Sequence, residues 1–456
     1  MANLSAQWAQ FVANWPGAAL PAAVRHEAIR SIVNSMGVTI AGARDPAIDR
    51  LARALRPFAG GALATRIGHG ERFDPATCAF INAASANVLD FDDTHLPTVI
   101  HPSAPVLAPL LALAEAASAP VSGIELIDAF TLGAEIACRL GNAMLQGHYE
   151  RGFHITTTCG VVGAAAAAAR LLRLDALQMQ HALGIAASGA GGLVENLGFM
   201  AKSVAVGASA RDGLLAACFA QSGMDAATSA LDGVHGFLRV LSEQPDESQL
   251  VTELGERWEI LNNTYKPYPC GVVLNPVIDA ILDSRGRPAF RIDQIRHIQV
   301  HGNPLLLVRA DRPAVVTGRE AKVSLQHCVA AAVLRGKLGI AEFRDEALRD
   351  ATILQLRRRV HAQADAACPV EAASVRVEFN DDTAIETAVL EARGSRKRPL
   401  EDAQLMEKFR DLVRATAPGI DAQALLDQLW SLEAVTDVRS IIRLCVPAAL
   451  PGQPTQ

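Results

Sequence analysis

The stretch CGVVGAAAAAARLL, residues 159–172, decides the fold. Alanine and glycine fill most of its positions, and no proline interrupts it. Such a run predicts a helix whose small side chains let neighbouring helices approach closely. A second run of this kind, GIAASGAGG, occupies residues 184–192. Because only 5% of the residues are aromatic, we expect a core built from closely packed helices rather than from aromatic clusters.

Helical periodicity dominates the first 245 residues. One helix is expected at residues 21–40, with a loosely defined end because Gly37 lies inside it and Gly42 just beyond it. Further helices are expected at residues 74–90, 105–118, 122–147, 159–172, 175–191 and 201–222.

The pattern changes near residue 270, where short segments begin to alternate apolar and polar side chains. This alternation predicts strands, and two of them flank a turn as in a β-hairpin. The predicted elements are strands at residues 295–301, 374–379 and 385–390, a turn at 380–383 and a helix at 320–334. Helical periodicity returns from residue 402 onward.

These changes predict a mainly α protein with two domains. A large all-helical domain comprises residues 1–268 and 401–456, and is therefore formed by both ends of the chain. A smaller α/β lid domain comprises residues 269–400. Because clefts between domains are preferred places for small-molecule sites, we expect the substrate to bind there.

The charge distribution argues against nucleic acid as a partner. The formal net charge is −6, and the only dense basic clusters, residues 357–359 and 396–398, are short. A membrane partner is not expected either, because Glu115 and Arg170 interrupt the apolar stretches before they reach the roughly 18 to 20 residues of a membrane span.

The N-terminus shows no signal-peptide pattern, and the eight cysteines form no C-x-x-C pair. Neither a disulfide framework nor a zinc site is therefore expected. A soluble protein in the reducing cytoplasm fits these observations.

Lysine is scarce in this chain. Only six lysines occur, none of them in the first 201 residues. Arginine effectively never deprotonates, so a retained lysine indicates a place that needs a compact ammonium or a movable proton. Lys202 lies in an apolar helical run, and Lys266 lies in NNTYKPYPCG. Lysines that snorkel at the edges of helices or loops would satisfy the same pattern.

The densest polar cluster is ANVLDFDDTHLPTVIHPS, residues 86–103. Within twelve positions, between two apolar helices, lie Asp90, Asp92, Asp93, Thr94, His95 and His101. The His-Pro-Ser step at the start of the second helix leaves backbone N–H groups near His101, and such groups bind anions. The spacing does not match a zinc-binding helix. A solvated loop with an aspartate cap is the alternative.

A second polar group is HYERGFHITTTCG, residues 148–160, where His154 precedes three threonines and a helix. Threonine hydroxyls cap helices or donate to carboxylates, so a structural histidine fits this pattern as well as a catalytic one. Further candidates lie in YKPYPC and SLQHC, residues 265–270 and 324–328. Lysines, histidines and an aspartate are the groups needed to move protons beside a carboxylate-bearing substrate.

Sequence motifs for cofactors are absent. The chain has no glycine-rich nucleotide loop and no G-x-S-x-G nucleophile motif. Its cysteine spacing offers no ligand set for an iron–sulfur cluster. We therefore expect chemistry by side chains alone, without a metal or a cofactor.

Taken together, six motifs resemble the MmgE/PrpD family, which includes 2-methylcitrate dehydratase, cis-aconitate decarboxylase and iminodisuccinate epimerase. Each motif is weak alone, but the six follow the family's order from about residue 20 to residue 445. The motifs are LDFDDT…HPS (89–103), RGFHITTTCGVVGAAAAAARLL (151–172), LGIAASGAGGL (183–193), MAKSVAVGASARDGLLAA (200–217), YKPYPCG (265–271) and EAKVSLQHCVAAAVLRG (320–336). The resemblance implies a large all-helical domain with a smaller α/β lid, usually in a homodimer.

The resemblance also implies the residues of the active site. Those expected to be catalytic are Asp90, His101, His154, Lys202 and Lys266. Those expected to bind the substrate are Thr94, Ser103, Thr156, Tyr265 and His327. In this interpretation the two histidines transfer protons and Asp90 orients one of them. The lysines bind carboxylates, and either lysine is an alternative general base.

The chain departs from the family pattern near these residues. Ala205 stands where the family often has a histidine, three residues after Lys202. His327 stands where the cis-aconitate decarboxylases carry a tyrosine, and the loop before His101 is one residue longer than theirs. These departures leave the substrate open.

Three functions fit these residues. The first is a cofactor-independent lyase that removes water from a tricarboxylate such as 2-methylcitrate. The second is decarboxylation of cis-aconitate or epimerisation of an iminodicarboxylate. The third is a non-catalytic helical dimer that binds carboxylates, although such a protein would be expected to lose some of the five catalytic candidates.

Overall fold

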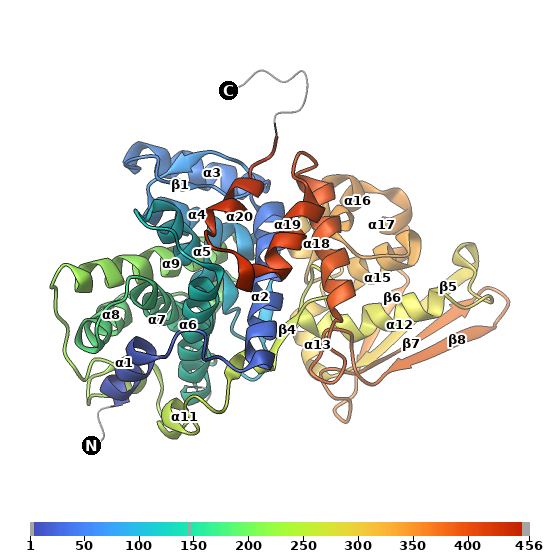
Figure 1. Ribbon diagram of the computed structural model, residues 1–456. Coiled ribbons are helices and arrows are strands. Elements are labelled where there is room, and N and C mark those ends of the chain that lie inside the picture. Colours follow the sequence, from blue (N-terminus) through green and yellow to red (C-terminus); the bar gives the residue numbers. More distant parts are fainter. Residues whose placement is uncertain (1–3, 145–146, 449–456) are drawn as a thin grey trace. The chain divides into compact units, whose positions relative to one another are not determined.

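The stretch CGVVGAAAAAARLL lies in helix α7 (Ile155–Leu171) of a mainly α protein, as its composition predicts. The computed structural model describes residues 4–144 and 147–448. The chain divides into two units, and Figure 1 traces its path through them. The helical unit comprises the residues up to 263 and those from 401 on, and the sheet unit comprises residues 264–400.

Helix α7 lies at the centre of the helical unit, where it packs against α6 (Gly123–Ala143) and α9 (Met200–Gln221). A Cβ atom on Gly133 of α6 would stand 2.6 Å from the carbonyl oxygen of Gly163 in α7. A Cβ atom on Gly163 would likewise stand 2.6 Å from the carbonyl oxygen of Gly133, so the two helix backbones are in direct contact. The predicted small-residue face is therefore the surface on which these helices pack.

The remaining helices of the helical unit come from both ends of the chain. They are α1 (Leu4–Asn14), α2 (Ala22–Gly42), α3 (Pro46–Leu55), α4 (Pro75–Val88), α5 (Ser103–Ala116), α8 (Ala176–Ser188), α10 (Phe237–Leu241), α11 (Ser248–Val251), α18 (Asp402–Thr416), α19 (Ala422–Trp430) and α20 (Arg439–Leu444). Helix α4 packs against α2, α5 and α9, and α18 packs against α2. The C-terminal segment is thus part of the same core as the N-terminal helices.

Every helix predicted between residues 21 and 222 is present, and some of them begin at side-chain caps. Ser122 and Asp175, for example, begin α6 and α8 with reciprocal capping hydrogen bonds. The predicted end of α6 at residue 147 is wrong, since the helix ends at Ala143; residues 145–146 lie outside the described residues.

The helical unit is not strictly all-helical, which corrects the expectation. Strand β1 (Ala64–Thr65) pairs antiparallel with β2 (Arg72–Phe73), and the short strand β3 (Asp93–His95) follows α4. Strand β4 (Asn263–Tyr265) lies where the chain leaves this unit.

The sheet unit contains β5 (Ile295–Gly302), β6 (Val360–Ala364), β7 (Ala373–Phe379) and β8 (Ala384–Val389), in the order β6-β5-β7-β8. The three predicted strands and the β7–β8 hairpin are confirmed. Strand β6 pairs parallel with β5 and was not predicted. Only Val360 of β6 is buried, so this strand lacks the alternation that reveals the others.

The helix predicted at residues 320–334 is wrong as a single element. It is divided into α14 (Gly318–Ala321) and α15 (Leu325–Arg335). The division follows from Ser324, whose Oγ accepts a hydrogen bond from His327 N at 3.2 Å and so begins α15. The other helices of the sheet unit are α12 (Asn275–Arg285), α13 (Pro304–Ala310), α16 (Asp345–Arg349) and α17 (Ala351–Arg357).

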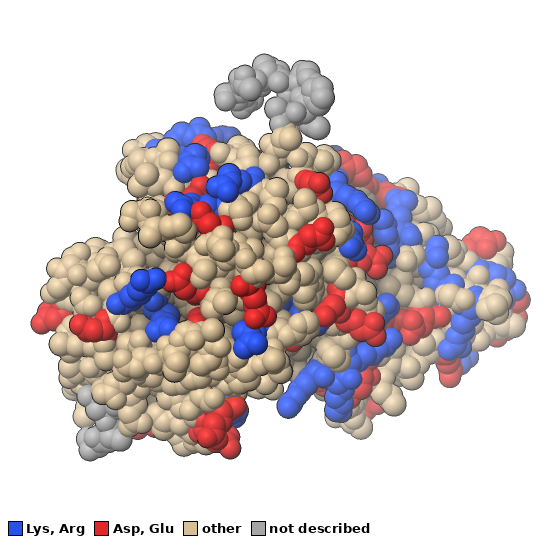
Figure 2. Space-filling view, viewed as in Figure 1, with Lys and Arg blue, Asp and Glu red and all other residues tan. Residues whose placement is uncertain are grey.

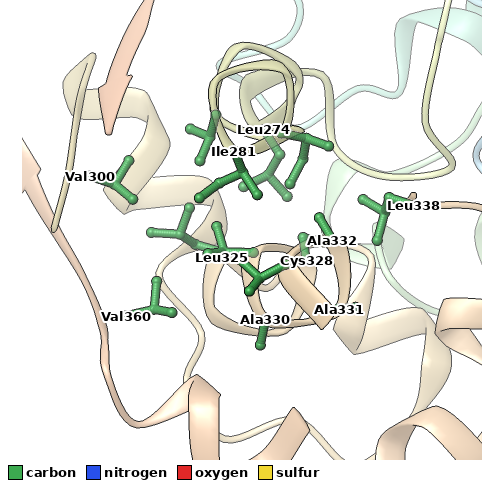
Figure 3. Packing of buried hydrophobic residues seen from close by; sticks show 14 of the residues in the cluster. Leu274, Ile281, Val300, Leu325, Cys328, Ala330, Ala331, Ala332, Leu338 and Val360 are labelled. Atoms are coloured by element: carbon green, nitrogen blue, oxygen red, sulfur yellow. The ribbon is translucent and has the colours of Figure 1, made fainter. Parts of the chain in front are cut away.

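The core of the sheet unit lies between its helices and one face of the sheet. Figure 3 shows Ile281 of α12 facing Leu325 and Cys328 of α15, with Val300 of β5 and Val360 of β6 beside them. All five side chains are buried. This apolar cluster explains why the buried positions of β5 and β7 are the apolar ones.

The segment 264–268, expected in the helical domain, falls in the sheet unit. The reason is a close backbone contact with the loop at Gly394. This glycine has a φ of +76°, and a Cβ atom there would stand 2.4 Å from the carbonyl oxygen of Tyr265. Only glycine therefore allows this loop to pack on the segment that carries Lys266.

The surface carries mixed charge. Figure 2 shows lysine and arginine side chains lying among aspartates and glutamates, with no continuous basic field over the face in view. Helix α9 is long and apolar enough to cross a membrane by length and composition, but 56% of its apolar window is buried inside the protein. Such burial is typical of a core helix.

Candidate active site

The loop between α4 and α5 carries most of the polar candidates and is folded tightly on itself. His95 N donates to Ile100 O at 2.7 Å, and Val99 N donates to His95 O at 2.8 Å. Asp90 and Val99 have φ values of +54° and +56°, a region that side chains other than glycine seldom adopt. Aspartate tolerates this conformation better than most residues, so its place at this turn has a local reason.

The ammonium of Lys202 in α9 donates to Asp90 Oδ1 at 2.8 Å. Burial of Lys202 lowers the pKa of its side chain, but the carboxylates of Asp90 and Asp92 outweigh burial and raise the pKa above its ordinary value. Lys202 is therefore a fixed positive charge at neutral pH.

His101 is oriented by the loop that carries it. Its Nδ1 lies 2.6 Å from the carbonyl oxygen of Asp93, 3.3 Å from Thr94 Oγ1 and 3.5 Å from Asp92 Oδ1. A carbonyl oxygen can only accept a hydrogen bond. Nδ1 therefore carries a proton and donates a hydrogen bond to the backbone carbonyl of Asp93. Nε2 is then the atom of His101 that exchanges a proton with a substrate.

Two residues that we expected to bind the substrate make hydrogen bonds to this loop, and their role in substrate binding stays a prediction. Ser103 Oγ donates to Asp93 Oδ2 at 2.6 Å, and Thr156 Oγ1 accepts from the backbone N–H of His101 at 3.1 Å. Asn263 Nδ2 also donates to Asp93 Oδ2, at 2.6 Å. Burial raises the pKa of Asp93 to about 6, and the hydrogen bonds from Ser103 and Asn263 only partly oppose it.

His154 stands at the start of α7, and its side chain is almost fully buried. Burial lowers its pKa to about 3, and the positive charges of Lys202 and His101 add to this effect. His154 is therefore a neutral imidazole at physiological pH. Its backbone N–H donates to Gly192 O at 3.1 Å, which joins α7 to the segment before α9.

Gly192 is the position at which this junction requires glycine. Its φ is +120°, and a Cβ atom there would stand 2.0 Å from Thr157 Oγ1. Any larger residue would push the segment away from the start of α7, and His154 with it.

Asp90, Asp92 and His101 also form a donor set of the kind that binds divalent cations. One ligand atom from each lies within 4.8 Å of the other two. The ammonium of Lys202 pairs with Asp90, so one of the two carboxylates of this cluster already has a cationic side chain beside it.

A second buried hydrogen-bond network supports the loop between α4 and α5 at His95. His95 Nε2 lies 3.1 Å from Glu259 Oε2, and His95 Nδ1 lies 2.7 Å from Thr98 Oγ1. Burial alone would raise the pKa of Glu259, but the hydrogen bond and charge of His95 hold it at about 2. The Glu259 backbone N–H in turn donates to Glu135 Oε2 at 2.7 Å.

Three of the expected site residues belong to the sheet unit. Tyr265 and Lys266 lie between β4 and α12, on the segment that the Gly394 loop contacts. His327 lies in α15 and is fully buried, with Nε2 2.7 Å from the carbonyl oxygen of Glu342. The role of these three residues in substrate binding stays a prediction.

The structure therefore brings together Asp90, Lys202 and His101 and places His154 within reach of their charges. Asp90 Oδ1 accepts from Lys202, and the carbonyl oxygen of Asp93 accepts from His101 Nδ1. That Asp90 orients one of the histidines stays a prediction. The sequence interpretation did not assign roles to Asp92, Asp93 or Asn263. The run of three acids in LDFDD was the available signal for the first two.

The chain is similar to known proteins over almost its whole length. Residues 6–250 match the family model of the MmgE/PrpD N-terminal domain, and residues 268–433 match that of the MmgE/PrpD C-terminal domain. The chain is 26% identical over 470 residues to the cis-aconitate decarboxylase-like protein oryM of Aspergillus oryzae, covering 97% of each chain.

Two further relatives are cis-aconitate decarboxylases. That of Aspergillus terreus is 26% identical over 455 residues, which cover 93% of this chain and 92% of the relative. That of Mus musculus is 26% identical over 432 residues, covering 91% and 88% respectively. The similarity therefore extends over both units.

Proposed function

Because the chain belongs to the MmgE/PrpD family, we propose that it is a lyase that decarboxylates cis-aconitate or a closely related tricarboxylate. The observation that carries this proposal is the partly buried pair of Lys202 and Asp90 beside His101, in a chain whose similarity to a cis-aconitate decarboxylase covers 93% of its length. No cofactor enters the proposed reaction.

The chemistry of the substrate explains what the residues would do. When the carboxylate on the methylene carbon of cis-aconitate leaves as CO₂, its bonding electrons form a new C=C bond. The original double bond shifts its electrons to the adjacent CH carbon, where a conjugated carboxylate takes up the charge. A fixed cation stabilises this charge in the transition state. We assign Lys202 to that role, with Lys266 as a second cation for another carboxylate.

The carbanion must then be protonated. His101 fits this step as an imidazolium: its Nδ1–H is held by the Asp93 carbonyl, and its Nε2–H is the proton that passes to the carbanion and leaves a neutral imidazole. His154 is the second candidate. Its pKa is low because of burial and neighbouring cations, and a bound tricarboxylate would add negative charge and raise that pKa.

Removal of water from 2-methylcitrate is the second candidate function. It stays a candidate because His327 stands where the cis-aconitate decarboxylases carry a tyrosine, which leaves the substrate open. In that reaction a basic His101 Nε2 would take the carbon-bound proton and a second acid would protonate the leaving hydroxide.

We also propose that the sheet unit acts as a lid and that the protein is a cytoplasmic homodimer. Exposed apolar side chains near the start of α9 support a dimer, because large exposed apolar patches mark interfaces. They are Leu193, Leu197, Phe199, Met200 and Val204. The eight cysteines are free thiols, as in a reducing compartment.

One incubation tests the proposal. The purified protein is mixed separately with cis-aconitate, 2-methylcitrate and iminodisuccinate in deuterated water, and the products are followed by NMR. Decarboxylation predicts loss of cis-aconitate and one deuterium on the product carbon that was protonated. Conversion of 2-methylcitrate alone would replace the first candidate with the second, and inert mixtures would contradict both.

A further inference from the structure

We propose that Lys408 is a positioning residue for the reaction, because it fixes from helix α18 the turn that carries Asp90. This inference rests on the proposed function, in which Asp90 and Lys202 act as a pair. Lys408 is one of the six lysines of the chain, and the assignments above give it no role.

The contacts of Lys408 converge on a single residue of the turn. Its Nζ donates to the carbonyl oxygen of Phe91 at 2.8 Å and to Asn34 Oδ1 at 2.8 Å. The same nitrogen lies 3.8 Å from the centroid of the Phe91 ring, in a cation–π contact. Asn34 belongs to α2, so Lys408 joins the C-terminal helix, an N-terminal helix and the loop after α4.

Two lysines thus hold consecutive residues of one turn. Lys202 binds the carboxylate of Asp90, and Lys408 binds the carbonyl group of Phe91. The turn needs such support, because Asp90 has a φ of +54° and Asp92 and Asp93 follow as two buried acids. Backbone in the left-handed region is strained for a residue with a side chain and persists only where surrounding contacts hold it.

The geometry also explains why this position is a lysine. One nitrogen meets two oxygen atoms and a ring face, which the three donors of a compact ammonium allow. A guanidinium spreads its donors over a plane and cannot place one atom in all three contacts. In a chain where arginine supplies almost all other positive charge, this requirement accounts for the retained lysine.

These contacts are to a carbonyl group, an amide and a ring, so Lys408 acts on the reaction through the turn. A loss of support moves the Asp90 carboxylate and, through it, the ammonium of Lys202. Displacements of about 1 Å in such a group cost up to about 100-fold in rate.

The test compares Lys408→Met with Arg414→Met, which removes a cation from an exposed position of the same helix. Hydrogen exchange in peptides that cover residues 88–95 is measured first, because it reports on the turn without any substrate. We expect exchange at least tenfold faster in Lys408→Met than in wild type, and no change in Arg414→Met. Unchanged exchange in Lys408→Met would overturn the inference.

Turnover of cis-aconitate gives the second readout. Lys408→Met is expected to lower kcat roughly 10- to 100-fold with a smaller change in KM, and to shift the pH profile of kcat, whereas Arg414→Met keeps the wild-type values. If Lys408 only stabilised the fold, Lys408→Met would have a lower Tm, but its folded fraction would keep the wild-type pH profile of kcat. That result would contradict the inference.

If Lys408→Met does not fold, Lys408→Arg takes its place, because it keeps the charge and most of the side-chain packing. We expect it to show faster exchange at residues 88–95 and at least fivefold lower kcat; wild-type values for both would overturn the inference. A wild-type protein that does not convert cis-aconitate refutes the proposed function, while the exchange measurement still tests the role of Lys408 in the turn.

Discussion

Lys202 Nζ and Asp90 Oδ1 lie 2.8 Å apart, although the two residues are separated by 112 positions in the chain. The pair joins α9 to the loop after α4 and gives a partly buried ammonium its counter-ion. Because neighbouring carboxylates raise the pKa of Lys202 above its ordinary value, the lysine stays charged at neutral pH. A charged lysine suits the carboxylate-binding role that the sequence predicted for it, and that role stays a prediction.

The first prediction concerns this ion pair. Asp90→Asn removes the charge that counteracts burial, so the pKa of Lys202 should fall. Since the reaction needs the charged lysine, the alkaline limb of the kcat/KM profile should move to lower pH. Asp212→Asn, on the surface of α9, is the matched control and should leave the profile in place. An unmoved alkaline limb in Asp90→Asn would show that Lys202 is not the group that titrates.

The second prediction concerns His154 and acid stability. Its pKa is about 3 in the folded protein against 6.5 in the unfolded chain, so the unfolded state binds more protons between these values. Stability is therefore lost as the pH falls from about 6.5 toward 3. From pH 7.5 to pH 5, wild type should lose on the order of 2 kcal/mol more than His154→Gln.

Urea unfolding of both proteins at the two pH values measures this difference. The comparison with His154→Gln cancels the contributions of the other titrating groups. Parallel pH dependences in the two proteins would mean that His154 is not held in its neutral form.

The third prediction concerns metal ions. Asp90, Asp92 and His101 form a possible donor set, but Lys202 supplies the positive charge at Asp90. Turnover should therefore survive dialysis against EDTA at its original rate. Loss of activity on chelation, with recovery after one divalent metal is added back, would assign the cluster to a metal instead.

The fourth prediction concerns the support of the loop by Glu259. Glu259→Gln leaves His95 beside an uncharged partner in a buried site, so the free energy of unfolding should fall by roughly 3 kcal/mol. Glu433→Gln removes an exposed partner of Arg25 and should cost less than about 1 kcal/mol. Equal effects of the two substitutions in denaturant unfolding would contradict a structural role for the His95–Glu259 pair.

Local patterns predicted much of the fold, because helices and hairpins are specified by neighbouring residues. The small-residue run in α7 and the capping residues of α6 and α8 lie within their own elements. Strand β6 escaped prediction because it is completed by a parallel partner about sixty residues away, and parallel pairing leaves no local turn signal.

The site was predictable in composition but not in its connections. Asp90, His101, His154 and Lys202 stood out as polar residues in apolar surroundings. The contacts that orient them join distant positions: Asn263 with Asp93 and Lys408 with Phe91 are separated by 170 and 317 residues. Tertiary packing alone determines such pairs, so the scarcity of lysine could mark Lys408 without showing its partner.

The central claim is that Lys202 stabilises the charge released when a tricarboxylate loses CO₂. It is tested most directly by the rate of CO₂ release from saturating cis-aconitate by wild type and by Lys202→Met. The account predicts one CO₂ per substrate consumed by wild type, and a rate at least about 100-fold lower for a folded Lys202→Met protein. Equal rates in the two proteins, or no CO₂ release by wild type, would contradict it.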